Sequence, residues 1–366
     1  MGKDNKYKFV FAGGGTGGHL YPAVAVAEKI KELKPEAEIM FIGTKSRIEG
    51  TVVPKLGYKF KPIWIKGFAR KLTLNNVLFP VKLVVSMGQS LLINAGFKPK
   101  VAIGSGGYVS GPAIWGASVL GAKVILLEQN SYPGVTTRML EKKAESIHIT
   151  FEESIKYFSE KEKLHMTGNP VRSSLVLFSK EEALKKFGLK TNYKTIVIIG
   201  GSLGAASINK TMGTVAGKLA DKNVQIIWQT GKNYYETYKN LNSDKIKVMP
   251  FIEDMAAAYS AADLVIARAG ATTIAELTSL GVAAMLVPSP NVAANHQYYN
   301  AKSLSDKDAA VLLMDDKLDS DLLNAVLETV NNEAKLNELR NNVKKFGKPD
   351  ASLIIAKNAI ELAESI

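Results

Sequence analysis

The sequence predicts an α/β protein made of two doubly wound parallel-sheet domains. Three observations lead to this class. The chain has 366 residues, which is too long for one ordinary hydrophobic core and fits two domains of typical size. Short apolar runs alternate with stretches of helical spacing, which favours parallel strands covered by helices on both faces. This alternation of strands and helices also begins twice, near residues 8 and 195, and each time it starts with a strand, a glycine-rich turn and a helix.

In the first domain, the apolar run 8–12 is followed by glycines and by the amphipathic stretch 21–33, which predicts strand, loop and helix. Further strands are expected at 39–42, 101–103, 123–127 and 146–150. Gly168, Asn169 and Pro170 then break the pattern. We therefore expect a first domain of residues 1–167.

The second domain starts with the strand 195–199, the glycine-rich turn 200–204 and a helix. Strands are expected at 224–228, 245–249, 264–267 and 283–287. This gives a second domain of residues 168–350. The final stretch, 351–366, has helical spacing and no strand after it.

Composition narrows the function classes. The chain has no cysteine, which excludes disulfides, thiolate metal sites and cysteine nucleophiles. Its net charge is +13, and ten basic residues but no acidic one lie between Glu49 and Glu128. A local basic field of this kind indicates an anionic partner. No signal-peptide pattern is seen, and no apolar run nears the roughly 20 residues that span a bilayer, so we expect an intracellular protein, at most peripheral to a membrane.

Two glycine-rich loops are candidate anion sites. Gly13, Gly15 and Gly18 match the G-x-G-x-x-G spacing before a helix, and the loop 104–112 follows another strand of the same sheet edge. A dinucleotide site also needs an acidic residue at the end of the second strand, and residues 41–45 offer none. A P-loop needs Gly-Lys-Ser/Thr, which is absent too. A diphosphate ligand fits both loops, and tight turns without a ligand are the alternative.

The second domain contains the more specific pattern for a nucleotide-binding site, in residues 267–277. These residues follow a predicted strand and begin a predicted helix. Ala271, Thr272 and Thr273 fall where helix N-terminal amides bind phosphate. Glu276 lies one turn further on, where a carboxylate can accept hydrogen bonds from two ribose hydroxyls. A glutamate that only stabilises the helix dipole is the alternative.

Eight motifs in order, GGGTGGHLYP, GSGGYVSGP, LEQN, TGNPVR, GGSLGA, PFIEDM, ARAGATTIAE and NHQYYNA, make the chain resemble the MurG family of bacterial peptidoglycan glycosyltransferases. The resemblance covers nearly the whole chain. It implies a GT-B fold of two Rossmann-like domains with an interdomain cleft, the helix 351–366 packing back on the first domain. The implied reaction is inverting transfer of N-acetylglucosamine from UDP-N-acetylglucosamine to the muramoyl 4-hydroxyl of undecaprenyl-diphosphate-linked N-acetylmuramoyl-pentapeptide. No cofactor and no metal ion are expected, and the implied location is the cytoplasmic face of the bacterial cell membrane.

The resemblance also implies roles for individual residues. The second domain would bind the UDP-sugar through Ser202, Ile252, Ala271, Thr272, Thr273, Glu276 and Gln297, with the role of His296 open. The first domain would close on the donor with Gly15, Thr16, Gly17, Asn130 and Arg172. It would hold the acceptor diphosphate with Gly14, Gly18, Ser105, Gly106 and Gly107.

The candidate general base is His19, because it starts the helix after the first glycine loop and histidine titrates near neutral pH. A hydrogen bond from His19 to the acceptor diphosphate is the alternative. Tyr108 and Glu128 are further candidates for acid–base or positioning roles. The Asp-x-Asp pairs at 306–308 and 319–321 match the spacing of metal-dependent transferases, but we interpret them as solvated surface.

A membrane-binding patch is expected within the acid-free window. Its apolar and basic members are Phe68, Leu72, Leu74, Leu78, Phe79, Arg70, Lys71 and Lys82. The alternative is that the apolar residues up to Ile93 are ordinary helix core, and we expect both, with one face packed and a few residues exposed. Rival functions are a UDP-N-acetylglucosamine 2-epimerase of the same fold, a basic nucleic-acid-binding module and an NAD-dependent dehydrogenase. We expect no nucleic-acid partner.

Overall fold

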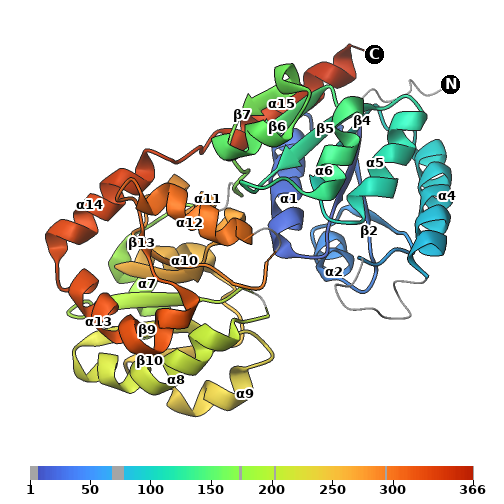
Figure 1. The fold of residues 1–366 in the computed structure, drawn as a ribbon. Helices are drawn as coiled ribbons and strands as arrows, with labels where there is room; N and C mark the ends of the chain where they lie inside the picture. Colours follow the sequence, from blue (N-terminus) through green and yellow to red (C-terminus); the bar gives the residue numbers. More distant parts are fainter. Residues whose placement is uncertain (1–6, 68–77, 173–174, 202, 293–294, 366) are drawn as a thin grey trace. The chain divides into compact units, whose positions relative to one another are not determined.

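Two parallel sheets contain every strand in the part of the chain that the computed structural model describes, which is residues 7–67, 78–172, 175–201, 203–292 and 295–365. The chain divides into two units (Figure 1). Unit 1 comprises residues 1–173 and 348–366, and unit 2 comprises residues 174–347. The predicted class, two α/β domains with parallel sheets, is confirmed. The unit boundary lies a few residues beyond the predicted one.

The sheet of unit 1 has seven strands in the order β3-β2-β1-β4-β5-β6-β7. Their bounds are β1 (Lys8–Gly13), β2 (Glu38–Gly43), β3 (Lys59–Pro62), β4 (Val101–Gly106), β5 (Lys123–Glu128), β6 (Ser146–Ile149) and β7 (Leu164–Met166). The strand order reverses between β1 and β4, which pair directly in parallel. In doubly wound sheets, ligands bind at the carboxyl ends of the strands at such a reversal.

Helices cover both faces of this sheet, and their bounds are α1 (Gly17–Leu33), α2 (Ile48–Lys55), α4 (Phe79–Phe97), α5 (Ser110–Val119), α6 (Val135–Leu140) and α15 (Ala351–Glu364). On one face, Phe9 and Phe11 pack with α1 and with Ile355 of α15. On the other, Val10 packs with Ile114 of α5. Figure 1 shows α15, at the end of the chain, back among the elements of unit 1, where it contacts α1.

Unit 2 repeats the design with six strands in the order β10-β9-β8-β11-β12-β13. The strands are β8 (Lys194–Ile199), β9 (Val224–Gln229), β10 (Ile246–Met249), β11 (Leu264–Arg268), β12 (Ala284–Val287) and β13 (Val311–Leu312). The helices are α7 (Lys180–Lys186), α8 (Ala206–Asp221), α9 (Tyr235–Tyr238), α10 (Met255–Ala261), α11 (Ala271–Leu280), α12 (His296–Ser305), α13 (Leu318–Val330) and α14 (Glu333–Lys344). Here the order reverses between β8 and β11, so the loops after these two strands flank the expected ligand position.

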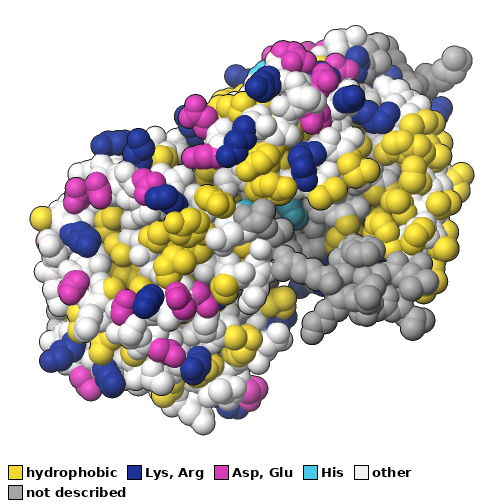
Figure 2. All heavy atoms as spheres, viewed as in Figure 1, with side chains coloured by type: hydrophobic (Ala, Val, Ile, Leu, Met, Phe, Trp, Pro, Cys, Tyr) yellow, Lys and Arg dark blue, Asp and Glu magenta, His cyan; other side chains and the backbone are white. Residues whose placement is uncertain are grey.

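Helix α4 packs its polar side chains inward. Lys82, Ser86, Ser90 and Asn94, four residues apart, are its buried residues. The Ser90 hydroxyl and the Asn94 amide both donate to the Ala113 carbonyl of α5, at 3.2 Å each. The outward face is apolar instead: Val81, Val84, Val85 and Leu92 are 53, 70, 38 and 78% exposed. Figure 2 shows the resulting hydrophobic surface over α4.

The membrane-patch prediction is therefore only partly tested by the structure. Phe68, Arg70, Lys71, Leu72 and Leu74 lie outside the described residues. Leu78 is 42% exposed, as the patch requires, whereas Phe79 is half-buried. Lys82 was expected among the outward cations, and this is wrong. Its side chain is buried, with Nζ 5.6 Å from the centre of the Trp64 ring, because Lys82 belongs to the inward polar row of α4.

A buried histidine links α15 to the sheet of unit 1. His148 of β6 is 3% exposed, and its Nε2 lies 3.1 Å from Oδ1 of Asn358 on α15. Its ring stacks on that of His165 in β7, with 5.3 Å between centroids. Burial lowers the pKa of His148 from 6.5 to about 4. The folded protein thus holds this imidazole neutral where the unfolded chain would protonate it.

This lowered pKa predicts acid destabilisation of unit 1. As pH falls from about 6.5 to about 4, the unfolded chain gains a proton that the folded chain resists, so the free energy of unfolding should drop by up to about 3 kcal/mol. Urea denaturation of the wild type and of His148→Gln across this range tests it, and the variant should show a flatter pH dependence. His165→Gln, a change at the exposed neighbour, should keep most of the wild-type slope. Equal slopes for the wild type and His148→Gln would contradict the assignment.

Candidate active site

The two glycine loops of unit 1 are joined at the strand reversal. The Ser105 hydroxyl, at the end of β4, donates to the His19 carbonyl at 2.6 Å. Close approach makes glycine necessary on both sides. A Cβ on Gly13 would lie 1.7 Å from the Ser105 hydroxyl, and one on Gly106, whose φ is +97°, would lie 2.7 Å from Nδ1 of His19. The two loops predicted to share a sheet edge are thus packed against each other.

The hydrogen bonds of His19 define its tautomer. Nδ1 lies 3.0 Å from the Ser105 carbonyl and 3.1 Å from Oε1 of Gln129. Gln129 donates its amide to the Leu127 carbonyl at 3.2 Å, which turns its oxygen toward His19. Both neighbours of Nδ1 are acceptors, so Nδ1 carries the hydrogen and Nε2 of the neutral ring is the proton acceptor. This is the arrangement that a general base requires. Gln129 was not singled out from the sequence.

Glu49 is a second residue that sequence reasoning missed. Its carboxylate is 1% exposed and accepts from the backbone N–H of Gly15 and of Thr44, at 3.0 Å each. A Cβ on Gly14 would lie 2.5 Å from this carboxylate. Glu49 thus fixes the first glycine loop, including Gly15 with φ +86°, against the turn after β2. Its only signal in the sequence is its position as the last acidic residue before the acid-free window.

Glu128 and Asn130 form one positioned loop after β5. Burial raises the pKa of Glu128, and its oxygens accept from the backbone N–H of Asn130 and of Gly134, at 3.0 Å each. These bonds fix the loop that carries Asn130, which favours the positioning role for Glu128 over the acid–base role. The Tyr108 ring covers Gly15, at 3.3 Å from where a Cβ would stand. The Tyr108 hydroxyl is buried without a hydrogen-bond partner in the described part of the chain.

The remaining first-domain candidates lie on or beside α1. Thr16 is the exposed residue that precedes the helix, and Gly17 and Gly18 form its first turn. A Cβ on Gly107, whose φ is +80°, would lie 2.5 Å from the Gly14 carbonyl oxygen. The Arg172 guanidinium lies 4.9 Å from the centre of the Tyr21 ring of α1. The structure thus brings these residues close to the first glycine loop or its helix.

In unit 2, the N-terminus of α11 lies at the strand reversal. Gly270 precedes the helix, and Ala271, Thr272 and Thr273 form its first turn, which holds no acidic residue. A Cβ on Gly270 would meet open space. The amides of this turn and the positive end of the helix dipole suit a phosphate. Ser202, in the loop after β8, lies outside the described residues.

Glu276 is buried one turn along α11. It is 9% exposed, and its Oε2 accepts a hydrogen bond of 2.6 Å from the Tyr259 hydroxyl of α10. Tyr259 is itself 2% exposed, so both partners of this hydrogen bond are buried. A carboxylate oriented in this way at a helix N-terminus can accept from ribose hydroxyls. Tyr259 was missed because, among four alanines, it has the pattern of ordinary core.

Two glutamines organise the loops around this helix. Gln229, at the end of β9, donates to the Gly201 carbonyl at 3.1 Å and accepts from the Ile252 N–H at 2.9 Å. The N–H of Ile252 is therefore engaged within unit 2. Oε1 of Gln297 accepts from the Ser289 N–H at 2.9 Å. His296 and Gln297 begin α12, which places them beside the loop after β12. Gln229 was another residue that the sequence did not reveal.

The two Asp-x-Asp pairs, which match the spacing of metal-dependent transferases, lie on the surface of unit 2. Asp306, Asp308, Asp319 and Asp321 are all exposed, as interpreted from the sequence. Asp306 pairs with Lys302 at 2.7 Å, and Asp319 pairs with Lys210 at 3.2 Å. Both pairs are ordinary surface ion pairs.

Comparison with known proteins agrees with this architecture. The family models for the glycosyltransferase family 28 N-terminal and C-terminal domains match residues 9–149 and 195–354. A relative from Flavobacterium psychrophilum is 43% identical over 98% of this chain and 99% of its own length. It is named UDP-N-acetylglucosamine–N-acetylmuramyl-(pentapeptide) pyrophosphoryl-undecaprenol N-acetylglucosamine transferase.

Solved structures of similar fold support the same family assignment. The crystal structure of MurG from Acinetobacter baumannii is 28% identical, with a TM-score of 0.74, covering 97% of this chain and 99% of that one. A putative UDP-N-acetylglucosamine 2-epimerase from Listeria monocytogenes has a TM-score of 0.70 over 98% of this chain and 96% of its own, but is only 11% identical, which shows a shared fold alone. Two α/β units of this topology, with these neighbours, define a glycosyltransferase of the GT-B class. The chain belongs to glycosyltransferase family 28, and the resemblance predicted from its motifs is confirmed.

Proposed function

We propose that this enzyme transfers N-acetylglucosamine from UDP-N-acetylglucosamine to undecaprenyl-diphosphate-linked N-acetylmuramoyl-pentapeptide, the step from lipid I to lipid II in peptidoglycan biosynthesis. The observation that carries the proposal is the N-terminus of α11 with Glu276 buried one turn behind it, at the strand reversal of unit 2. The name of the Flavobacterium psychrophilum relative, which aligns over nearly the full length of both chains, supports the same donor and acceptor.

The donor half of the reaction belongs to the second domain, 168–350. Glu276 accepts hydrogen bonds from the ribose, and the amides of Ala271–Thr273, with Ser202, bind the diphosphate. Ile252 meets the uracil through its backbone, and Gln297 reaches the sugar with its amide. The departing UDP gains negative charge as the bond to the anomeric carbon breaks. Preorganised N–H groups at the helix N-terminus stabilise that charge without reorganisation during the reaction.

The acceptor half belongs to the first domain, 1–167, with α15. The loops around Gly14, Gly18 and Ser105–Gly107 bind the acceptor diphosphate. Nε2 of His19 takes the proton of the acceptor hydroxyl while its oxygen attacks the anomeric carbon. The bond from that carbon to UDP breaks, and UDP leaves with the electron pair. Direct displacement of this kind inverts the anomeric centre and gives a β-linked product from an α-linked donor.

The outward face of α4 suits the surface of a membrane that contains the lipid acceptor. No helix in the described part of the chain is long and apolar enough to cross a bilayer. The exposed side chains of Val81, Val84, Val85 and Leu92 form one contiguous helix face, in a window that has ten basic and no acidic residues. Apolar burial and attraction to anionic headgroups act together in such a surface. We assign this face to the cytoplasmic surface of the bacterial membrane.

The double variant Val84→Glu, Leu92→Glu should lose binding to anionic phospholipid vesicles. Burying each aliphatic side chain contributes about 1.5–3 kcal/mol, so the partition coefficient should fall at least tenfold. Cosedimentation with phosphatidylglycerol-containing vesicles measures it. Ile354→Glu, at another exposed apolar position of unit 1 on α15, is the matched control and should bind like the wild type. Unchanged binding of the double variant would refute the assignment of this face.

Transfer itself is tested with labelled UDP-N-acetylglucosamine and a short-chain lipid-diphosphate-muramoyl-pentapeptide. Label should enter the lipid product in a β linkage. The epimerase alternative makes a different prediction, since it needs only the UDP-sugar and would yield the 2-epimer without an acceptor. A folded, UDP-binding protein that transfers no label would defeat the proposed function.

A further inference from the structure

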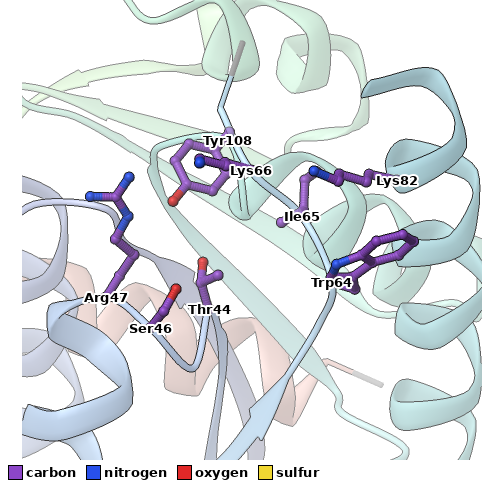
Figure 3. Close-up of a pocket in the computed structure, with 8 residues that line it drawn as sticks. All are labelled: Thr44, Ser46, Arg47, Trp64, Ile65, Lys66, Lys82 and Tyr108. Carbon is purple, nitrogen blue, oxygen red and sulfur yellow. The ribbon is translucent and has the colours of Figure 1, made fainter. Parts of the chain in front are cut away.

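A cavity of unit 1 lies beside the two glycine loops and has no role in the reaction described above. It holds about 270 Å3 at the carboxyl ends of β2 and β3, the same sheet edge as the glycine loops. Residues of the turn after β2, the segment after β3, α4 and the second glycine loop line it (Figure 3). The N–H of Ile63 donates to Gly43 at 2.9 Å, and that of Trp64 donates to Gln89 of α4 at 2.7 Å. These bonds hold the walls in place.

The lining of the cavity is cationic. Arg47, Lys66 and Lys82 line it, and none of the described lining residues is acidic. Neither Arg47 nor Lys66 forms an ion pair with any residue that the structure describes. The nearby carboxylate of Glu49 faces the backbone N–H groups of Gly15 and Thr44. Positive charge in this concave site is therefore available to a ligand.

Two hydroxyl groups add hydrogen-bonding capacity. The Tyr108 hydroxyl and Oγ1 of Thr44 are buried, and within the described residues neither has a hydrogen-bond partner. Figure 3 shows both beside the same space, with the Arg47 guanidinium on one side and Trp64 on the other. Buried polar groups without partners are uncommon in native proteins, because each costs about 1–3 kcal/mol. An oxyanion would satisfy both hydroxyls and pair with Arg47 through two parallel hydrogen bonds.

We infer that this cavity binds a carboxylate of the acceptor's peptide. The inference rests on the proposed function, which supplies an acceptor with a peptide. In the proposed function, the amides of the glycine loops bind the acceptor diphosphate, which leaves the cavity for another group of the acceptor. The Tyr108 ring lies over Gly15, between that loop and the cavity. Trp64 and Ile65 add apolar walls, which suit an organic carboxylate better than a phosphate. Arg47 then determines preference for acceptors that carry the peptide.

The test compares two acceptors with two variants. The acceptors are lipid-diphosphate-muramoyl-pentapeptide and the same lipid without the peptide. Arg47→Gln removes the cavity cation, and Lys45→Gln removes an exposed cation of the same turn that does not line the cavity. Arg47 only precedes α2 and makes no side-chain cap, so both variants should fold, which thermal denaturation checks. With the peptide acceptor, Arg47→Gln should raise the acceptor KM about tenfold or more and leave the KM for UDP-N-acetylglucosamine unchanged.

With the peptide-free acceptor, Arg47→Gln should behave like the wild type, and Lys45→Gln should do so with both. An equal rise in KM with both acceptors would assign the cavity to the diphosphate and overturn the inference. So would an unchanged KM with both. Calorimetry with soluble muramoyl-pentapeptide needs no transfer, and Arg47→Gln should weaken this binding about tenfold. A wild-type protein that binds the peptide in this manner but transfers no sugar would refute the proposed function and leave the cavity assignment standing.

Discussion

Replacing His19 with alanine should lower kcat by at least a hundredfold and up to about ten-thousandfold, the usual contribution of a positioned general base. Nδ1 is engaged by Ser105 and Gln129, so Nε2 is the nitrogen that can take the acceptor proton. The loss should appear in kcat with the peptide acceptor, while the KM for UDP-N-acetylglucosamine changes little. Steady-state kinetics of the purified variant measure both quantities.

The same experiment separates the base from the alternative role of His19. A histidine that only binds the acceptor diphosphate would, when removed, raise the acceptor KM and leave kcat within a factor well under one hundred. His165→Ala, a change at an exposed histidine of unit 1, should leave both parameters close to wild type.

Replacing Glu276 with alanine should weaken UDP binding about a hundredfold or more. Without the Glu276 carboxylate, the ribose hydroxyls would lose two charge-assisted hydrogen bonds, and each is worth at least about 1.5 kcal/mol. Calorimetric titration with UDP measures the loss directly, without acceptor or catalysis. A weakening of less than about threefold would return Glu276 to the role of a helix-dipole residue.

Two further variants sharpen this result. Tyr259→Phe removes the 2.6 Å hydrogen bond that orients the carboxylate but keeps the carboxylate itself. It should weaken UDP binding by a smaller factor, between about threefold and tenfold. Glu253→Gln, at an exposed acidic residue of the same unit, is the matched control and should bind UDP like the wild type.

The sequence predicted the central strands of both sheets because these strands are buried on both faces. Residues 9–12 and 196–199 are continuous apolar runs, and both proved to lie in strands beside a reversal of strand order. The edge strands β3, β7 and β13 were not predicted. Their side chains are largely exposed or half-buried, so no hydrophobic pattern marks them. The polar inner face of α4 was missed for a related reason, since close packing against Gly116 of α5 selects small side chains such as Ser90 there.

Local requirements explain which part of the site was predictable. Glycines at close approaches of the backbone, and a helix that directly follows a strand, each produce a pattern within a few residues of the sequence. The two glycine loops and the first turn of α11 could therefore be predicted. Glu49 and Gln129 form hydrogen bonds with residues 34 and 110 positions away in the sequence. No neighbouring sequence pattern therefore predicts their roles. Tyr259 belongs to the core by composition and to the site only by its contact with Glu276. Long-range hydrogen bonds thus define the part of the site that sequence patterns do not contain.

The most direct measurement is a crystal structure of the protein with UDP bound. The ribose hydroxyls should lie within hydrogen-bond distance of the Glu276 carboxylate, and the diphosphate should lie at the first turn of α11, beside Ala271–Thr273. Nucleotide bound in any other place, with this turn and Glu276 unoccupied, would contradict the account of donor binding.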